Sequence, residues 1–197
     1  MEKTLIDPAA LAAFMEAGSA VVIDTRTPEE YAAGHIPGAV NIREIFSYLA
    51  TSTPDGLTEL HQTFADLLGA AGLSGPEHAV IYEDAMNNGY GQSCRGYFLL
   101  NYLGYKNVSI LHGGLTAWTE AGMPLTTDVP APEKKMFPLA VDSSLMVTTP
   151  EMLASLDDPS IVKLDVRDWD EWAAESSSPY GKNFTPPQRP YSRRRAD

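Results

Sequence analysis

Residues 79–104 have the sequence AVIYEDAMNNGYGQSCRGYFLLNYLG, which predicts a strand, a polar Gly-rich loop and a helix in that order. Val80–Tyr82 is a short apolar run of β-prone residues, as a buried parallel strand requires. The helix is expected to begin near Ser93, a good N-cap residue, and to end at Gly104. A loop between a parallel strand and a helix N-terminus directs backbone N–H groups at one point. Such a point can bind an anion or activate a nucleophile.

The composition limits the class of protein. With 197 residues, of which 44% are hydrophobic, the chain can form one full α/β domain with residues left over. Its net charge of −12 argues against nucleic acid and anionic membrane surfaces as partners. One cysteine excludes an internal disulfide and a multi-cysteine metal site, and it suits a reducing, cytoplasmic location. The sequence predicts no signal peptide, transmembrane span, metal ion or other cofactor.

Strand and helix patterns alternate on both sides of the opening stretch. Further strands are expected at Ala20–Asp24, Ala39–Ile42 and Asn107–Leu111, and further helices after Asp7, after Thr27, over Leu57–Ala71 and after Gly114. The helix after Thr27 carries a capping box with Glu30. This alternation predicts an α/β fold, a mostly parallel sheet with helices on both faces. Ligands of such sheets bind at the carboxyl ends of the strands, where Asp24, Glu83 and His112 lie.

An internal repeat follows a Pro-containing stretch. Residues 127–146 have no clear periodicity and predict a linker. The opening pattern then returns, with a strand expected at Ser160–Asp165. The matching positions are Asp24 with Asp165, Arg26 with Arg167, and Glu30–Tyr31 with Glu171–Trp172. We therefore expect a first domain over residues 5–126 and an incomplete second copy of it over residues 147–182.

Three motifs in this order resemble the rhodanese family of sulfurtransferases. They are Val21–Arg26 with Glu30–Tyr31, the turn Gly34–Ala39, and Leu111–Leu115 with Trp118 and Gly122–Pro124. The repeated opening is similar to tandem thiosulfate or 3-mercaptopyruvate sulfurtransferases, and residues 175–182 look like an insertion found in the second domain of some of them. The resemblance implies a rhodanese-like fold and transfer of sulfane sulfur through a cysteine persulfide. It also implies a catalytic second domain and a non-catalytic first domain.

The resemblance puts the nucleophile at the first loop residue after Val80–Tyr82, and that residue is Glu83. A carboxylate cannot form a persulfide and would repel an anionic sulfur donor. Cys94 is the alternative, because it lies near the expected helix N-terminus beside Arg95. It is either a relocated nucleophile with a lowered pKa or a small residue packed under the loop. Arg95 and Arg167 are the candidates to bind the donor. Arg167 matches a substrate-binding position of the family but has no completed pocket, so we expect it to be vestigial.

Other polar residues have structural explanations. Asp24 and Arg26 form either a substrate-binding pair or an ion pair that caps the strand end and anchors the following turn. Together with Glu30 and Asp165 they are assigned to the structural motif of the family. His35 and His112 lack metal-ligand spacing and are expected in a turn and a loop, and Trp118 and Tyr97 are expected in the core.

The C-terminal residues lose the α/β pattern, and residues 183–197 predict a basic irregular tail. Pro190–Arg194 can be encoded by codons that, when read one base later, give Arg-Ile-Pro-Gly. The Ile-Pro-Gly of this shifted frame matches the start of the turn Ile36–Ala39. A frameshift that ended the second domain early is one explanation, and a natural basic tail is the other. Because about 35 residues cannot hold a core alone, the incomplete copy should dock on the first domain, pair with another chain or stay mobile.

Three functions remain open from the sequence. The first is the non-catalytic half of a tandem sulfurtransferase, the second a rhodanese-like binding or regulatory module, and the third a weak sulfurtransferase that uses Cys94. The expected partners are a small anionic sulfur donor if the chain is active, and a separate catalytic domain or a second copy of the chain.

Overall fold

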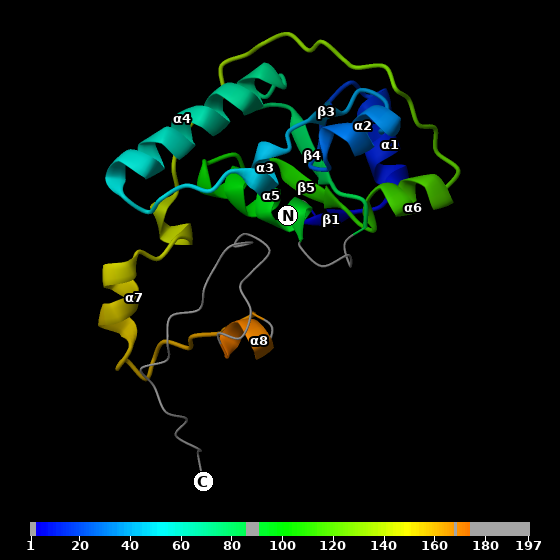
Figure 1. Cartoon of the computed structure of the whole chain (residues 1–197). Helices are drawn as coiled ribbons and strands as arrows, with labels where there is room; N and C mark the ends of the chain where they lie inside the picture. Colours follow the sequence, from blue (N-terminus) through cyan, green and yellow to red (C-terminus); the bar gives the residue numbers. More distant parts are fainter. Residues whose placement is uncertain (1–2, 86–90, 168, 174–197) are drawn as a thin grey trace. The chain divides into compact units, whose positions relative to one another are not determined.

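The computed structural model describes residues 3–85, 91–167 and 169–173. They belong to two compact units, Met1–Thr148 and Thr149–Asp197. The first unit contains a five-stranded sheet in the order β1-β5-β4-β2-β3, in which all neighbouring strands are parallel (Figure 1). The expected α/β class is thereby confirmed.

The elements of the first unit follow the expected alternation. The strands are β1 (Leu5–Ile6), β2 (Ala20–Asp24), β3 (Val40–Asn41), β4 (His78–Tyr82) and β5 (Val108–Leu111). The helices are α1 (Pro8–Glu16), α2 (Pro28–Ala33), α3 (Glu44–Ser47), α4 (Pro54–Ala70), α5 (Gln92–Tyr102) and α6 (Gly114–Glu120). β1 and α3 were not predicted, whereas the two-residue β3 lies within the strand expected at Ala39–Ile42.

Local capping chemistry sets several helix boundaries. Thr27 and Glu30 form the expected capping box on α2, and the Thr27 backbone N–H, the largest influence, lowers the pKa of Glu30. α4 begins before the predicted Leu57, because the Thr53 side chain caps it. α5 begins at Gln92 with Gly91 as its N-cap, at φ 54°, so the expectation that Ser93 caps this helix is wrong.

Side chains of the sheet alternate between two hydrophobic cores. Ile23 and Ile81 belong to the core that α3, α4 and α5 cover. Val22 and Val80 belong to the core under α1, α2 and α6, where Trp118 is buried as expected. Figure 1 shows the two sets of helices on opposite sides of the strands. Such period-two burial on both faces is what a parallel sheet requires.

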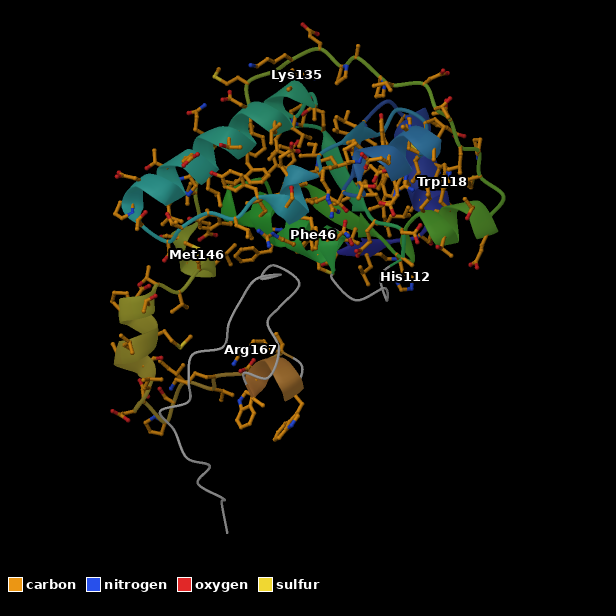
Figure 2. The ribbon with its side chains drawn as sticks, in the orientation of Figure 1. Phe46, His112, Trp118, Lys135, Met146 and Arg167 are labelled. Carbon is orange, nitrogen blue, oxygen red and sulfur yellow. The ribbon has the colours of Figure 1, made fainter. Side chains whose placement is uncertain are left out.

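Residues 127–146, which we call the strap, are attached to the first unit. The strap contains one 3₁₀ turn, Ser143–Leu145, and no strand. Its backbone N–H groups at Lys135 and Ala140 donate to the carbonyls of Gly69 and Leu103. Phe137 is buried in the core that α3, α4 and α5 cover. In Figure 1 the strap passes over the upper edge of the unit from α6 to α4, and Lys135 is labelled there in Figure 2.

Substitution of Gly104 tests the attachment of the strap. Gly104 has φ 92°, and a Cβ atom there would overlap the carbonyl oxygen of Ala140. We expect Gly104→Ala to lower the free energy of unfolding by about 3 kcal/mol, from backbone strain and displacement of the strap. Gly122, at φ 73° with open space around it, is the matched control, and Gly122→Ala should cost about 1 kcal/mol. Equal losses in urea denaturation would contradict a fixed strap.

The ion pair between Lys135 and Glu77 predicts an acid dependence. The Lys135 Nζ donates to Glu77 Oε1 at 2.7 Å. Burial of Glu77 raises its pKa, but the hydrogen bonds from Lys135 and Ser74 outweigh this effect and lower the pKa from 4.5 to about 2. The stabilisation is therefore complete above pH 4.5 and is lost as the pH falls towards 2.

Lys135→Met should thus cost up to about 1 kcal/mol near neutral pH and almost nothing near pH 2, because the pair is partly exposed. Urea titrations of both proteins over this pH range measure the difference. Lys134→Met, which removes an exposed charge from the same strap, is the control. A difference that persists unchanged at the lowest pH would contradict the assignment.

The second unit differs from its prediction. It contains α7 (Thr149–Ser155) and α8 (Trp169–Trp172), but the strand predicted at Ser160–Asp165 is not formed. The described residues of this unit include no strand that could pair with it. Val162 and Leu164 are 80% and 81% exposed. The described residues of this unit therefore have no core of their own, whereas residues 174–197, with the expected insertion and basic tail, lie outside the described residues.

Candidate functional site

The carboxyl ends of three neighbouring strands form the candidate site. Asp24 is the last residue of β2, Glu83 follows β4, and His112 follows β5. β4 lies between β2 and β5 in the sheet, so these positions share one edge of it, as expected. None of the helices in the described part of the chain is long and apolar enough to cross a membrane.

Asp24 and Arg26 form a buried, multiply bonded ion pair. The Arg26 Nη2 donates to Asp24 Oδ2 at 2.7 Å and its Nε to both carboxylate oxygens at 3.2 Å. The backbone N–H of Arg26 also donates to Asp24 Oδ1 at 2.8 Å. Asp24 is fully buried and Arg26 is 6% exposed. The burial of Arg26 works against its charged form, but Asp24 outweighs this effect and raises the pKa of the guanidinium.

The same pair fixes the turn after α2. Arg26 Nη2 also donates to the carbonyl of Gly34 at 2.8 Å. The Tyr82 hydroxyl donates to Asp24 Oδ2 at 2.5 Å and accepts from the backbone N–H of Ile36 at 3.3 Å. Burial, followed by the charge of Asp24, raises the pKa of Tyr82. The geometry therefore favours the structural interpretation of Asp24 and Arg26 over a substrate-binding pair.

Glu83 is buried at the N-terminus of α5. Its side chain is almost fully enclosed, because the residue is 1% exposed. Oε2 accepts from the backbone N–H of Gln92 at 3.0 Å, and Oε1 accepts from the Ser93 hydroxyl at 2.7 Å. A helix N-terminus is a natural anion site. At α5 the carboxylate of Glu83 already supplies the anion, at the position where the resemblance expects a nucleophile.

The backbone at Glu83 is fixed from a second helix. The N–H groups of Leu115 and Thr116, in the first turn of α6, donate to the carbonyls of Glu83 and Asp84 at 2.9 and 3.0 Å. Gly114 is required for this approach, because a Cβ atom there would overlap the Glu83 carbonyl oxygen. Residues 86–90, in the predicted Gly-rich loop, lie outside the described residues.

Cys94 lies on the outer side of α5. It is a free, exposed cysteine, so the expectation that it packs under the loop is wrong. Partial burial of the thiol and the nearby charge of Glu83 raise its pKa. An activated nucleophile requires the opposite shift, because only the thiolate attacks sulfur.

Two arginines lie on neighbouring helices of the first unit, Arg95 in α5 and Arg43 at the N-cap of α3. Arg95 Nη2 donates to the carbonyl of Tyr48 at 2.7 Å. Arg43, which the sequence analysis missed, donates from Nη1 to the carbonyl of Thr25 and to Gln92 Oε1, both at 3.0 Å. Arg43 also lies over the ring of Phe46, which Figure 2 labels. The sequence feature that could have identified Arg43 is its position directly after the predicted strand Ala39–Ile42.

Asp165 and Arg167, in the second unit, form a local ion pair of the same kind. Arg167 donates from Nη2 to Asp165 Oδ2 at 2.5 Å and from its backbone N–H to Oδ1 at 3.1 Å. Unlike the buried Asp24 and Arg26, the Asp165 side chain is 36% exposed and the Arg167 side chain is 55% exposed. Arg167 belongs to the second unit, whereas the other site candidates belong to the first.

The two histidines occupy a turn and a loop. His35 is buried, with its ring stacked on Tyr31 and its two ring nitrogens 2.9 and 3.1 Å from the carbonyl oxygens of Tyr31 and Asp128. His112 is exposed at the end of β5 (Figure 2). Within the described ranges, no group of three or more His, Cys, Asp or Glu residues is placed to hold a metal ion.

Comparison with known proteins places this site in context. Residues 7–121 match the model of the rhodanese-like domain family. Thiosulfate sulfurtransferase of Cricetulus griseus is 32% identical over 142 residues, which cover 71% of this chain and 46% of that protein. The enzyme of the same name from Azotobacter vinelandii is 29% identical over 171 residues, 87% of this chain and 62% of that protein.

Solved structures agree on the fold. The structure of the 3-mercaptopyruvate sulfotransferase SseA from Escherichia coli matches with a TM-score of 0.65 and 23% identity, over 78% of this chain and 63% of that one. This chain therefore spans about half to three-fifths of the length of these relatives.

Proposed function

Because this chain belongs to the rhodanese-like domain family, we propose that it is the non-catalytic half of a sulfurtransferase. The whole protein would move sulfane sulfur from thiosulfate or 3-mercaptopyruvate to a thiophilic acceptor. The names of the relatives support this donor class. The observation that carries the non-catalytic role is the buried Glu83, hydrogen-bonded at the expected nucleophile position.

The chemistry of sulfur transfer explains why Glu83 matters. A thiolate attacks the outer sulfur of thiosulfate, the S–S bond breaks, sulfite leaves with the electron pair, and a cysteine persulfide remains. An acceptor such as cyanide then takes the sulfur and releases the thiolate. A carboxylate cannot take the first step, and the charge of Glu83 repels the anionic donor. The catalytic cysteine would belong to the second domain, as the resemblance implies.

Activity assays on the purified chain test the proposal. We expect thiosulfate:cyanide and 3-mercaptopyruvate sulfurtransferase activities at the level of a protein-free blank, for the parent and for Cys94→Ser alike. Activity in the parent that disappears in Cys94→Ser would overturn the proposal and make Cys94 the nucleophile. Cyanolysable sulfur on Cys94 after incubation with thiosulfate would be independent evidence for that outcome.

A complementation assay separates this role from a purely regulatory module. A separately produced catalytic domain of a tandem sulfurtransferase is assayed with and without this chain. An increase in activity supports the role of a non-catalytic half. The same activity in both samples would favour the binding or regulatory module instead.

We also propose that the protein works in the cytoplasm. The free cysteine Cys94 is exposed, and it would persist as a thiol in a reducing compartment.

A further inference from the structure

Residues 162–166, which lie between α7 and α8 in the second unit, present an exposed apolar face (Figure 1). Val162, Leu164 and Val166 alternate with charged residues along this segment and are 80%, 81% and 93% exposed. Alternate side chains of an extended chain point to the same side. In a strand these three side chains would therefore form one apolar stripe, and its burial against another strand would be favourable.

The backbone of this segment is open to pairing as well. In the described part of the chain, no backbone N–H or C=O group of residues 162–166 makes a hydrogen bond. Unpaired backbone groups beside an apolar stripe are a template for another strand. The described residues of the second unit contain no strand that could fill this place, whereas another molecule of the same protein carries the same segment.

Two such segments fit each other as an antiparallel pair centred on Leu164. Leu164 then faces its counterpart in the other molecule, and Val162 faces the other molecule's Val166. All the apolar side chains lie on one face of the pair. On the opposite face Lys163 lies across from the other molecule's Asp165, so residues of opposite charge are neighbours.

Other registers are less favourable. A parallel pair in register places Lys163 against Lys163 and Asp165 against Asp165, and an antiparallel pair centred on either residue also brings like charges together. A shift by one residue puts charged and apolar side chains on the same face. A parallel pair shifted by two residues keeps only two of the three apolar pairs. The pair centred on Leu164 is therefore the one that combines full apolar contact with favourable charges.

The charged side chains are already bonded within their own chain. Lys163 Nζ donates to the carbonyls of Ser155 and Asp158. Asp165 accepts from Arg167. Association of two segments therefore gains little from new ion pairs, and the register is set by repulsion between like charges in the alternatives.

We propose that two molecules of this protein associate through residues 162–166 as an antiparallel strand pair centred on Leu164. The pair has two-fold symmetry, so both molecules use the same surface and this contact alone closes at a dimer. It involves neither Glu83 nor a sulfur donor, so the inference goes beyond the proposed function. Because a two-stranded pair is marginally stable in water, we expect a Kd on the order of 100 µM.

Sedimentation equilibrium of the full chain tests the association at concentrations from about 10 µM to about 1 mM. We expect a monomer–dimer equilibrium in the parent protein. Leu164→Lys would place two cations against each other at the centre of the pair and should weaken dimerisation more than about tenfold. Leu153→Lys, at an exposed apolar position of α7, should leave it unchanged. A parent protein that stays monomeric, or an equal loss in both variants, would overturn the proposal.

Cysteine cross-linking tests the register. Cys94→Ser removes the native thiol and serves as the background for the other substitutions. Oxidised glutathione should convert Leu164→Cys to a disulfide-linked dimer about tenfold faster than Val162→Cys, which is as exposed but does not face its counterpart. A mixture of Val162→Cys with Val166→Cys should also cross-link rapidly. Equal rates for Leu164→Cys and Val162→Cys, each alone, would contradict the antiparallel pair.

Discussion

Arg26→Met should lower the free energy of unfolding by about 3–5 kcal/mol, because it leaves the Asp24 carboxylate buried without its cation. Asp24 has no solvent exposure, and Arg26 supplies three of the side-chain hydrogen bonds to it. Methionine fills similar space without charge, so the loss reports on the unpaired carboxylate and on the released Gly34 carbonyl. Urea denaturation followed by circular dichroism measures the effect.

The second copy of the motif provides the control. Arg167 makes the same bonds to Asp165, but its side chain is 55% exposed. Arg167→Met should therefore change the free energy of unfolding by less than about 0.5 kcal/mol. If Arg26→Met cost no more than Arg167→Met, burial would not be what makes the first pair essential. Asp24→Asn combined with Arg26→Met should recover part of the loss, since no buried charge then remains unpaired.

The comparison of the two copies explains which features the sequence could predict. The Asp–x–Arg pair and the capping box of Thr27 with Glu30 join residues two or three apart, and both formed as their local chemistry predicts. The strand at Ser160–Asp165 has the same kind of apolar pattern as β2 but did not form. A strand is stabilised by neighbours distant in sequence, and β2 has β3 and β4 on its two sides.

Distance in the sequence also accounts for the parts of the site that were missed. The Tyr82 hydroxyl contacts Asp24, 58 residues away, and Arg43 contacts Gln92, 49 residues away. No periodicity or spacing rule connects such residues. The position of Glu83 at the strand end was predictable from the alternation of strands and helices, whereas its two hydrogen bonds to α5 required the fold.

Glu83→Gln should destabilise the first unit and leave it without sulfurtransferase activity. A glutamine offers one acceptor oxygen where Glu83 offers two, so either the Gln92 N–H or the Ser93 hydroxyl loses its present partner. We expect a loss of about 1–3 kcal/mol in the free energy of unfolding. Asp84→Asn, at an exposed neighbouring carboxylate, should cost less than about 0.5 kcal/mol. Similar losses in both variants would contradict the specific role of Glu83 at the helix N-terminus.

The thiol of Cys94 gives a second readout of the same substitution. Burial and the Glu83 carboxylate both raise the pKa of Cys94, so removal of the Glu83 charge should lower it. More thiolate is then present at a given pH below the thiol pKa, and alkylation by iodoacetamide should become faster. Asp84→Asn should leave this rate unchanged. An unchanged rate in Glu83→Gln would mean that the carboxylate does not act on the thiol. The expected faster alkylation would show that the fixed negative charge at this strand end suppresses thiolate formation at Cys94.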